Sequence, residues 1–234
     1  MMKKTSLIAL VLTGLLLTAC REHIDIQGVT SLYELEGRML YLRVYHSGEL
    51  ISIDSARIQH GKFHFKGEAC DSSVMANLFL GDESVMPIVL DGQPLKVTLN
   101  ENERKVEGSE LNDSLFAFIR RKALLESQIA ELPRRESQMI LSGIDHDEIL
   151  ARLNEEASRL GAQNDALVMR FIKDNMANVL APGVFMIVTS GFPYSVLNPQ
   201  IEELVTLASE TFLNDEYVRD YLKMARENMD KMNE

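Results

Sequence analysis

The side chains best suited to chemistry in this sequence include a lone internal cysteine. Cys70 lies in "KGEACDSS", directly after a segment with strand periodicity. A nucleophilic or redox cysteine needs a neighbouring base or a second thiol, and the residues around Cys70 supply neither. We therefore favour a structural cysteine. A disulfide with a partner protein and a thiol-dependent enzyme are the alternatives, and the enzyme is the weaker of the two.

Three histidines raise the question of a metal site. His60 and His64 are four residues apart, and His46 precedes them in the chain. On a helix that spacing can direct two imidazoles at one ion, but here the residues flank a predicted turn and strand. Zinc sites need three or four convergent ligands. We therefore expect surface histidines, no bound metal and no other cofactor.

Two further segments carry candidate polar or aromatic groups. Asp54-Ser55 lies outside any Gly-x-Ser-x-Gly or Ser-x-x-Lys context, so we expect hydrogen bonds from its side chains to the backbone at a strand bend. The loop "GFPYSVLNP" holds Phe192 and Tyr194 between helix breakers. These aromatic residues either bind a ligand or partner or anchor the loop to the core. We identify no catalytic residue.

The start of the chain has the pattern of an export signal. Lys3 and Lys4 precede an apolar run over residues 7–19, which is shorter than the roughly 20 residues that span a bilayer. The run ends in a tetrapeptide that resembles a bacterial lipobox, in which signal peptidase recognises Leu17, Thr18 and Ala19 and the cysteine that follows, Cys20, is lipidated. An ordinary cleaved signal or an uncleaved short helix are the other interpretations.

The lipobox predicts how the protein is held in the cell. We expect residues 1–19 to be a lipoprotein signal peptide and residues 20–23 to be the lipidated N-terminus and a short tether. Several acyl chains on one cysteine give stable anchoring, which a single chain does not. The expected location is exported and lipid-anchored at the outer membrane, on its periplasmic face or at the cell surface.

Composition narrows the possible partners and bonds. The net charge is −11, and removal of Lys3 and Lys4 with the signal lowers it to about −13. Such an acidic surface argues against nucleic acid as a partner, because phosphate backbones bind basic surfaces. Once Cys20 carries lipid, Cys70 has no cysteine within the chain to pair with, so packing has to hold the fold together.

The elements divide the chain into two parts. Residues 24–108 contain seven or eight short segments with period-two alternation, such as "RMLYLRVYH" and "KFHFK", separated by turns that include His60-Gly61. They predict an antiparallel β-sandwich or barrel-like domain. Residues 109–234 have helical periodicity. The predicted fold class is α+β, with the β domain first and the helical region second.

The helical region is expected to begin with a hairpin over about residues 110–177. Its first helix is capped by Ser109 or Asn112 and ends at Pro133. Its second helix is capped by Asp145, and Asn164 interrupts an otherwise apolar seam. That seam runs through Leu150, Leu153, Ala157, Leu160, Leu167 and Phe171. Shorter helices are expected over 199–210, after an Asn198 cap, and over 215–232.

Two stretches carry a resemblance to a known family. "IDSARIQHGKFHFKGE" and "VEGSELNDSL" resemble the domain of unknown function numbered 4369, which often precedes a thioredoxin-like domain in exported proteins of Gram-negative bacteria. The likeness extends over about residues 24–234. The sequence contains no Cys-x-x-Cys and ends near the point where the thioredoxin-like domain would begin. The resemblance therefore implies no redox activity for this chain.

These observations favour a membrane-anchored lipoprotein that acts as a non-enzymatic interaction or adaptor module in the cell envelope. The resemblance suggests a thioredoxin-like or other envelope protein as its partner. The alternative is a ligand-binding lipoprotein, with an aromatic-rimmed pocket between sheet and helices for a sugar, peptide or lipid.

Overall fold

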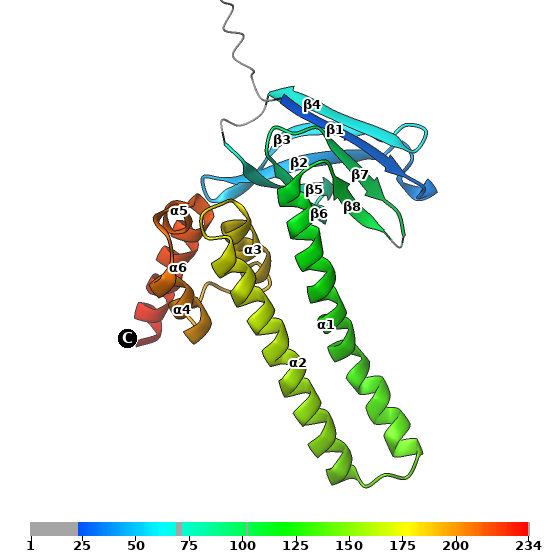
Figure 1. Cartoon of the computed structure of the whole chain (residues 1–234), viewed down its shortest axis with the longest axis vertical. Coiled ribbons are helices and arrows are strands. Elements are labelled where there is room, and N and C mark those ends of the chain that lie inside the picture. Colours follow the sequence, from blue (N-terminus) through cyan, green and yellow to red (C-terminus); the bar gives the residue numbers. More distant parts are fainter. Residues whose placement is uncertain (1–22, 69–71, 102, 234) are drawn as a thin grey trace, which may run out of the picture.

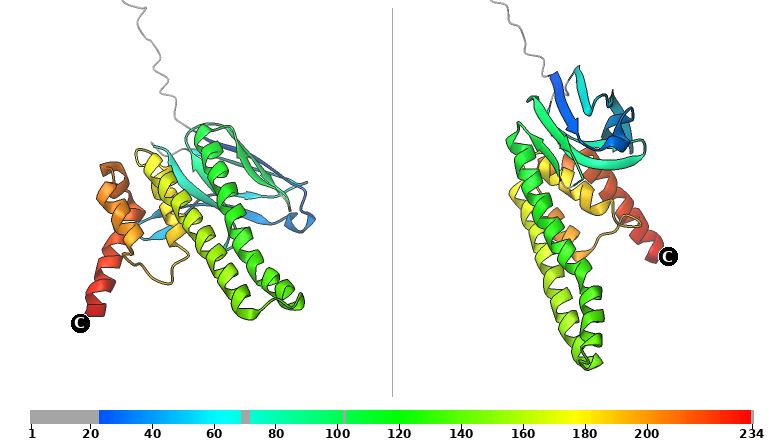
Figure 2. Two further views of the ribbon diagram at one scale, coloured as in Figure 1. Left: turned by 60° about the horizontal axis from the view of Figure 1, so that its bottom comes forward. Right: turned by 90° about the vertical axis from the view of Figure 1, so that its right-hand side faces the viewer.

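The chain folds into a β-sandwich from which a long helical hairpin extends (Figure 1). A computed structural model of the whole chain describes residues 23–68, 72–101 and 103–233. The remaining helices lie beside the half of the hairpin nearest the sandwich, and Figure 2 shows the same arrangement from two other sides. The predicted α+β fold class, with the β domain first, is confirmed.

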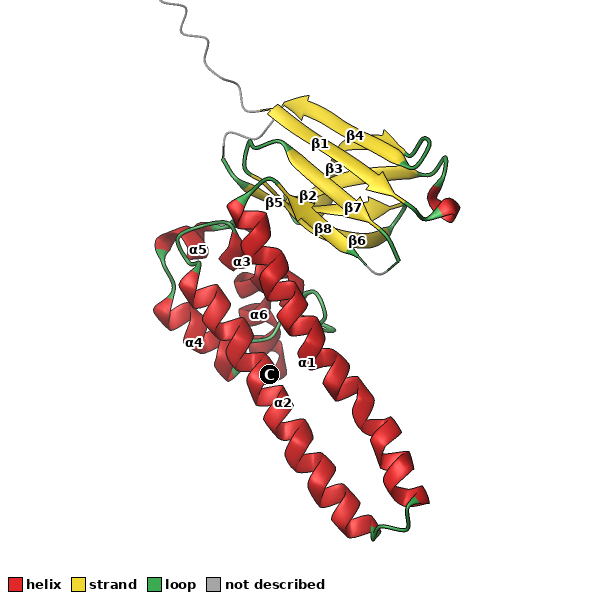
Figure 3. Cartoon of the chain, turned by 45° about the vertical axis from the view of Figure 1, so that its right-hand side comes forward, coloured by secondary structure: helices red, strands yellow, loops and turns green. Residues whose placement is uncertain are grey.

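Two four-stranded sheets build the sandwich (Figure 3). Their strand orders are β4-β1-β7-β8 and β3-β2-β5-β6, so the sheets are open and form no closed barrel. Neighbouring strands are antiparallel except β1 and β7, which are parallel. The alternation of apolar and polar residues along the sequence does not distinguish the two kinds of pairing. The strands are β1 (His23–Thr30), β2 (Met39–His46), β3 (Glu49–Arg57), β4 (Lys62–Glu68), β5 (Val74–Leu80), β6 (Glu83–Leu90), β7 (Leu95–Leu99) and β8 (Arg104–Glu107). A short 3-10 helix (Tyr33–Leu35) follows β1.

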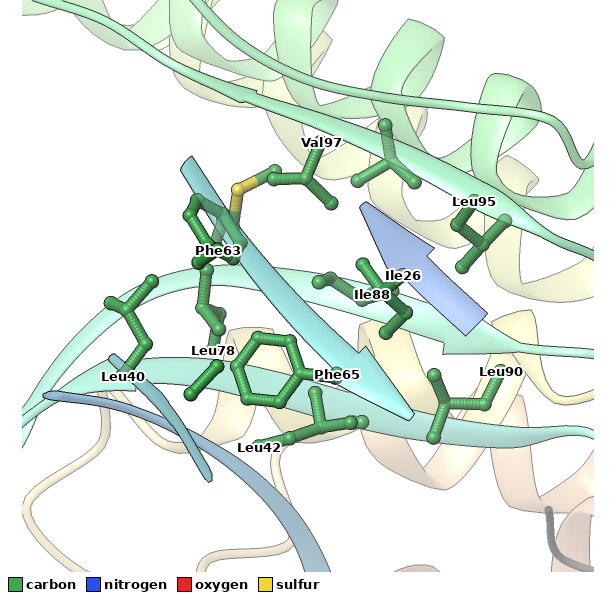
Figure 4. Close-up of a cluster of buried hydrophobic side chains, with 14 of the residues drawn as sticks. Ile26, Leu40, Leu42, Phe63, Phe65, Leu78, Ile88, Leu90, Leu95 and Val97 are labelled. Carbon is green, nitrogen blue, oxygen red and sulfur yellow. The ribbon is translucent and has the colours of Figure 1, made fainter. Parts of the chain in front are cut away.

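Apolar side chains from both sheets meet in the sandwich core (Figure 4). Phe63 and Phe65 point inward from β4, as the alternation predicts, and their rings lie edge to face with centroids 6.0 Å apart. Between them on the strand, His64 is exposed and contacts Asp25 of β1. The turn before β4 has positive φ at both His60 (53°) and Gly61 (68°), which is the geometry that suits a two-residue hairpin.

Six helices follow the strands within the described residues. They are α1 (Glu110–Leu141), α2 (His146–Asp174), α3 (Leu180–Thr189), α4 (Pro199–Leu207), α5 (Glu210–Asn214) and α6 (Glu216–Asn233). The predicted caps are confirmed at Ser109, Asp145 and Asn198, whose side chains accept hydrogen bonds from the first turns. The helix predicted over 199–210 is wrong in extent, because Ser209 caps a separate helix, α5.

The prediction that Pro133 ends the first helix is wrong. Proline inside a helix costs about 3 kcal/mol, because it lacks an N–H and its ring crowds the preceding turn. The helix nevertheless continues to Leu141. Contacts with α2 support the continuation: Leu132 is buried against Ile149, and the guanidinium of Arg135 donates to the Glu156 carboxylate at 2.6 Å.

The hairpin of α1 and α2 agrees with the predicted antiparallel pair, with one correction to the seam of α2. Leu150 is 39% exposed, whereas the preceding Ile149 is fully buried and packs on Leu132. Leu153 and Leu160 are buried as expected. The seam therefore begins one residue earlier, since the helix starts at the Asp145 cap with Ile149 already facing α1.

A second apolar core joins the sandwich to the helices. Met75 of β5 and Val89 of β6 point away from the sandwich core and pack among residues of α1, α3 and α6. Gly183 of α3 allows a close approach, because a Cβ at this position would lie 2.2 Å from the terminal carbon of Met75. The middle of β5 is therefore buried on both faces, and one face of the sheet β3-β2-β5-β6 is partly covered by helices.

Hydrogen bonds at the start of α1 join the helical region to the β-sandwich. The Asn112 side chain, which is fully buried, accepts a hydrogen bond from the Val89 N–H (2.9 Å) and donates one to the Val89 carbonyl (2.8 Å). The Ser109 hydroxyl caps α1 and also donates to the Asp91 carboxylate. The edge of β6 is thus satisfied by a helix side chain in place of a further strand. In the described residues, no helix is both long and apolar enough to cross a bilayer.

Candidate binding groove

The most promising site is a groove between the sheet and the helices. The outer face of β2, β5 and β6 forms its floor, and α1, α3 and the start of α6 form its walls. The volume is about 590 Å³, within the range of small-molecule and peptide sites. We call this space the sheet–helix groove. Apolar groups dominate its lining, among them Phe79, Phe118, Met186 and Leu50.

A buried polar side chain lies on the floor of the sheet–helix groove. Asn77 is at the middle of β5, between Met75 and Phe79 on the outer face of the sheet, and it is only 9% exposed. Across the sheet it is paired with Arg43 and Pro87. No hydrogen bond joins its carboxamide to another group among the described residues. The amide atoms are not sealed from solvent, so their donor and acceptor are available to a molecule bound in the groove.

Aromatic side chains close one end of the groove. The rings of Tyr45 (β2) and Tyr217 (α6) meet edge to face with centroids 5.0 Å apart. The Tyr45 hydroxyl donates to the Asp220 carboxylate at 3.1 Å, and the Tyr217 hydroxyl lies 2.9 Å from that of Thr189. Burial, together with the hydrogen bond to Asp220, raises the pKa of Tyr45 to about 12. Burial also raises the pKa of Tyr217. Both phenols therefore remain neutral donors at physiological pH.

The tip of the β2–β3 hairpin holds α6 at this end. The Ser47 N–H donates to one Glu216 carboxylate oxygen at 2.7 Å, and the other oxygen lies 3.3 Å from Nδ1 of His46. Glu216 opens α6, where a carboxylate also suits the helix dipole. The contact fixes Tyr217, the next residue, against Tyr45. The walls of the groove are thus positioned by direct contacts between the β domain and the last helix.

A second hollow adjoins the sheet–helix groove on the helical side. It lies between α2, α3 and α4, has a volume of about 470 Å³, and shares Lys122, Glu126 and Ile187 with the groove. We call it the helical hollow. Asn164 lines it, and the amide oxygen of Asn164 is buried without a hydrogen-bond partner in the described part of the chain. The residue that interrupts the predicted apolar seam therefore borders this hollow, with its amide oxygen covered by neighbouring atoms.

The two aromatic residues of the predicted binding loop have different environments. Phe192 is half-buried, packs against the helical core and lines the helical hollow. Tyr194 is 53% exposed and lines neither space. The aromatic residues at the sheet–helix groove are instead Tyr45, Phe79 and Tyr217, together with Phe118. A groove does lie between sheet and helices, and its aromatic residues come from other elements than this loop.

The remaining sequence candidates lie away from the groove. Asp54 accepts hydrogen bonds from the backbone N–H groups of Ser55 (2.7 Å) and Lys66 (3.1 Å), which confirms its predicted backbone-bonding role. His64 lies 2.7 Å from Asp25, and this contact lowers the pKa of the Asp25 carboxyl. No cluster of three metal-ligating side chains occurs over 23–68, 72–101 and 103–233.

Both cysteines and the lipobox fall outside the part of the chain that the structure describes. This applies to Cys70 and to Cys20 with the three residues before it, Leu17, Thr18 and Ala19. Their roles remain predictions from the sequence.

Comparison with known proteins identifies the first part of the molecule. Residues 25–115 match the family described as "Domain of unknown function (DUF4369)". The matched region contains the sandwich except for the first two residues of β1, together with the start of α1, and it ends three residues after Asn112. The chain therefore carries a DUF4369 domain over less than half of its length. No curated protein and no solved structure matches the chain.

Proposed function

We propose that this protein is a lipid-anchored, non-enzymatic interaction module of the cell envelope that holds a partner in the sheet–helix groove. The observation that carries the proposal is the groove itself. Its apolar lining and few inward-facing polar groups are typical of binding sites. Because its walls come from both the DUF4369 domain and the helical region, a bound partner would also stabilise their relative positions.

The lipobox supports the cellular side of the proposal. Lipid on Cys20 would place the β domain next to the membrane, since β1 begins at His23. The acidic surface, with its net charge of −11, gives anionic lipid little electrostatic attraction. Attachment would then depend on the acyl chains. An outer-membrane location with the groove accessible to envelope proteins fits both features.

The groove can be filled without disturbing either core. Ala123 lies exposed on α1 at the edge of the groove, so Ala123→Trp should occupy the space that a partner needs. Ala130 is exposed on the same helix outside the groove, and Ala130→Trp is the matched control. Both variants should fold, because neither residue is buried.

The test is crosslinking in intact cells, followed by purification from membranes and mass spectrometry. We expect wild type and Ala130→Trp to capture the same envelope protein, with a thioredoxin-like protein as the first candidate, and Ala123→Trp to lose it. Equal capture by all three proteins would contradict the proposal.

The alternative, a small sugar or lipid ligand, has its own readout. A ligand that binds only the folded state raises the unfolding temperature by mass action. A thermal-shift screen of such compounds would then show a shift in wild type that Ala123→Trp abolishes. That outcome, without a captured protein, would replace the adaptor with a ligand-binding protein.

A further inference from the structure

We infer that the sheet–helix groove binds an extended, apolar stretch of polypeptide and that the Asn77 carboxamide pairs with a peptide group of this stretch. This inference rests on the proposed function and specifies the chemistry of the segment bound. Asn77 is only 9% exposed and has no hydrogen-bond partner among the described residues, and its amide atoms are not sealed from solvent but reach the open groove on whose floor it lies.

The chemistry of the Asn77 side chain points to an amide as its partner. A carboxamide offers a donor and an acceptor side by side, as does a peptide group in an extended chain. The same chain shows this recognition elsewhere, because the Asn112 side chain bonds both the N–H and the carbonyl of Val89. An ionic ligand would instead call for a buried opposite charge. Of the charged residues in the lining of the groove, Lys122 and Glu126 pair with each other and Glu49 is exposed to solvent, so none is a buried unpaired charge.

The surroundings of Asn77 suit the side chains of such a peptide. Phe79 lies two residues further along β5 and Pro87 lies opposite Asn77 on β6, and both line the groove. Phe118 and Met186 face the sheet from α1 and α3. Methionine side chains adapt to different apolar partners. The groove would therefore bind apolar side chains with modest selectivity, while the Asn77 carboxamide forms hydrogen bonds with the peptide backbone.

The adjoining helical hollow indicates that the bound segment is elongated. The hollow shares Lys122, Glu126 and Ile187 with the groove, so the two spaces lie next to each other at these side chains. Asn164 presents a second buried amide oxygen without a partner in the described part of the chain. A chain that extends from the groove to the hollow would bring a peptide N–H to this oxygen once the side chains that cover it move aside. A compact sugar or a single acyl chain would satisfy one amide at most.

Peptide selection tests the inference directly. Heptapeptides from a random phage-displayed library are selected on the full chain carrying Cys20→Ser, which lacks the acyl chains. The enriched peptides are synthesised and their dissociation constants are measured by fluorescence anisotropy. We expect apolar sequences whose binding is weakened about tenfold by Asn77→Leu, the size of effect that one or two hydrogen bonds produce. Asn154→Leu, the same change at an exposed position of α2, should leave binding unchanged.

A backbone substitution in the peptide provides evidence that needs no variant protein. Replacing one amide of an enriched peptide by an ester removes its N–H. One of these esters should bind wild type more weakly than the parent peptide does. The same ester and the parent peptide should bind Asn77→Leu with equal affinity.

The outcomes separate this inference from the proposed function. If Ala123→Trp abolishes peptide binding but Asn77→Leu and every ester leave it intact, the groove binds peptides and the role of Asn77 is wrong. If no peptide is enriched but Ala123→Trp still loses the crosslinked envelope protein, the proposed function stands and the extended-peptide inference fails. If neither test depends on the groove, both fail.

Discussion

Asn112 and Val89 are joined by two hydrogen bonds through which a helix side chain completes the edge of a β-sheet. Asn112 Oδ1 lies 2.9 Å from the Val89 nitrogen and Nδ2 lies 2.8 Å from the Val89 oxygen. The pair ties the first turn of α1 to β6 and so sets the direction in which the hairpin leaves the sandwich. It also aligns Phe118, six residues later, with the wall of the groove.

Asn112→Ala should therefore destabilise the protein more than most single changes. It leaves the N–H and carbonyl of Val89 buried without partners, and each unpaired group costs about 1–3 kcal/mol. The measurement is the free energy of unfolding from urea denaturation. Asp113→Ala, at the neighbouring exposed position, is the control and should change stability by less than about 1 kcal/mol. Equal effects would mean that the Asn112 bonds contribute little.

Pro133→Ala should have the opposite effect. Proline in the interior of α1 is less favourable than alanine by up to about 3 kcal/mol, so the substitution should raise the urea midpoint. Pro199 occupies the start of α4, where proline is well tolerated. Pro199→Ala should therefore bring no gain. A midpoint unchanged by Pro133→Ala would show that the helix bends or opens at this point.

The Tyr45 hydroxyl predicts a pH dependence. Its pKa is raised to about 12 in the folded protein from an ordinary value of 10. A phenol with a raised pKa stabilises the fold below the ordinary value, and this contribution is lost as the pH rises from 10 towards 12. Stability measured through this window should fall in wild type and fall less steeply in Tyr45→Phe. Tyr33→Phe, at a position that is 90% exposed, should match wild type.

Membrane anchoring can be tested at the residue that the lipobox names. Cells are grown with a labelled fatty acid, and the protein is isolated. Cys20→Ser should abolish the label, because the acyl chains are attached through this cysteine. Cys70→Ser should retain both label and membrane association. Label that persists in Cys20→Ser would refute the lipoprotein prediction.

Local patterns predicted most of the elements. Alternation in "KFHFK" gave the inward direction of Phe63 and Phe65, and Asp145 and Asn198 marked helix starts through their capping side chains. These features depend on residues a few positions apart. Pro133 misled the prediction, because contacts with α2 outweigh its local cost.

The groove could not be predicted in the same way. Tyr45 and Asp220, which meet at its end, are 175 residues apart in the chain. Their meeting depends on how the hairpin tip docks on α6, which no local periodicity records. One signal was present in the sequence. Asn77 is the only polar residue in "VMANLFL", a strand otherwise typical of burial on both faces. A polar residue in such a strand has to find a partner or face a site.

Site-specific photo-crosslinking tests the central claim most directly. A photoreactive amino acid is placed at Ser190, which is exposed at the groove, and in a second strain at Ser137, which is exposed on the distal part of α1. After irradiation of intact cells, we expect the Ser190 position to form a discrete adduct with one envelope protein and the Ser137 position to form none. An adduct equally strong at Ser137, or no adduct at Ser190, would contradict the account of the groove as the site where this protein holds its partner.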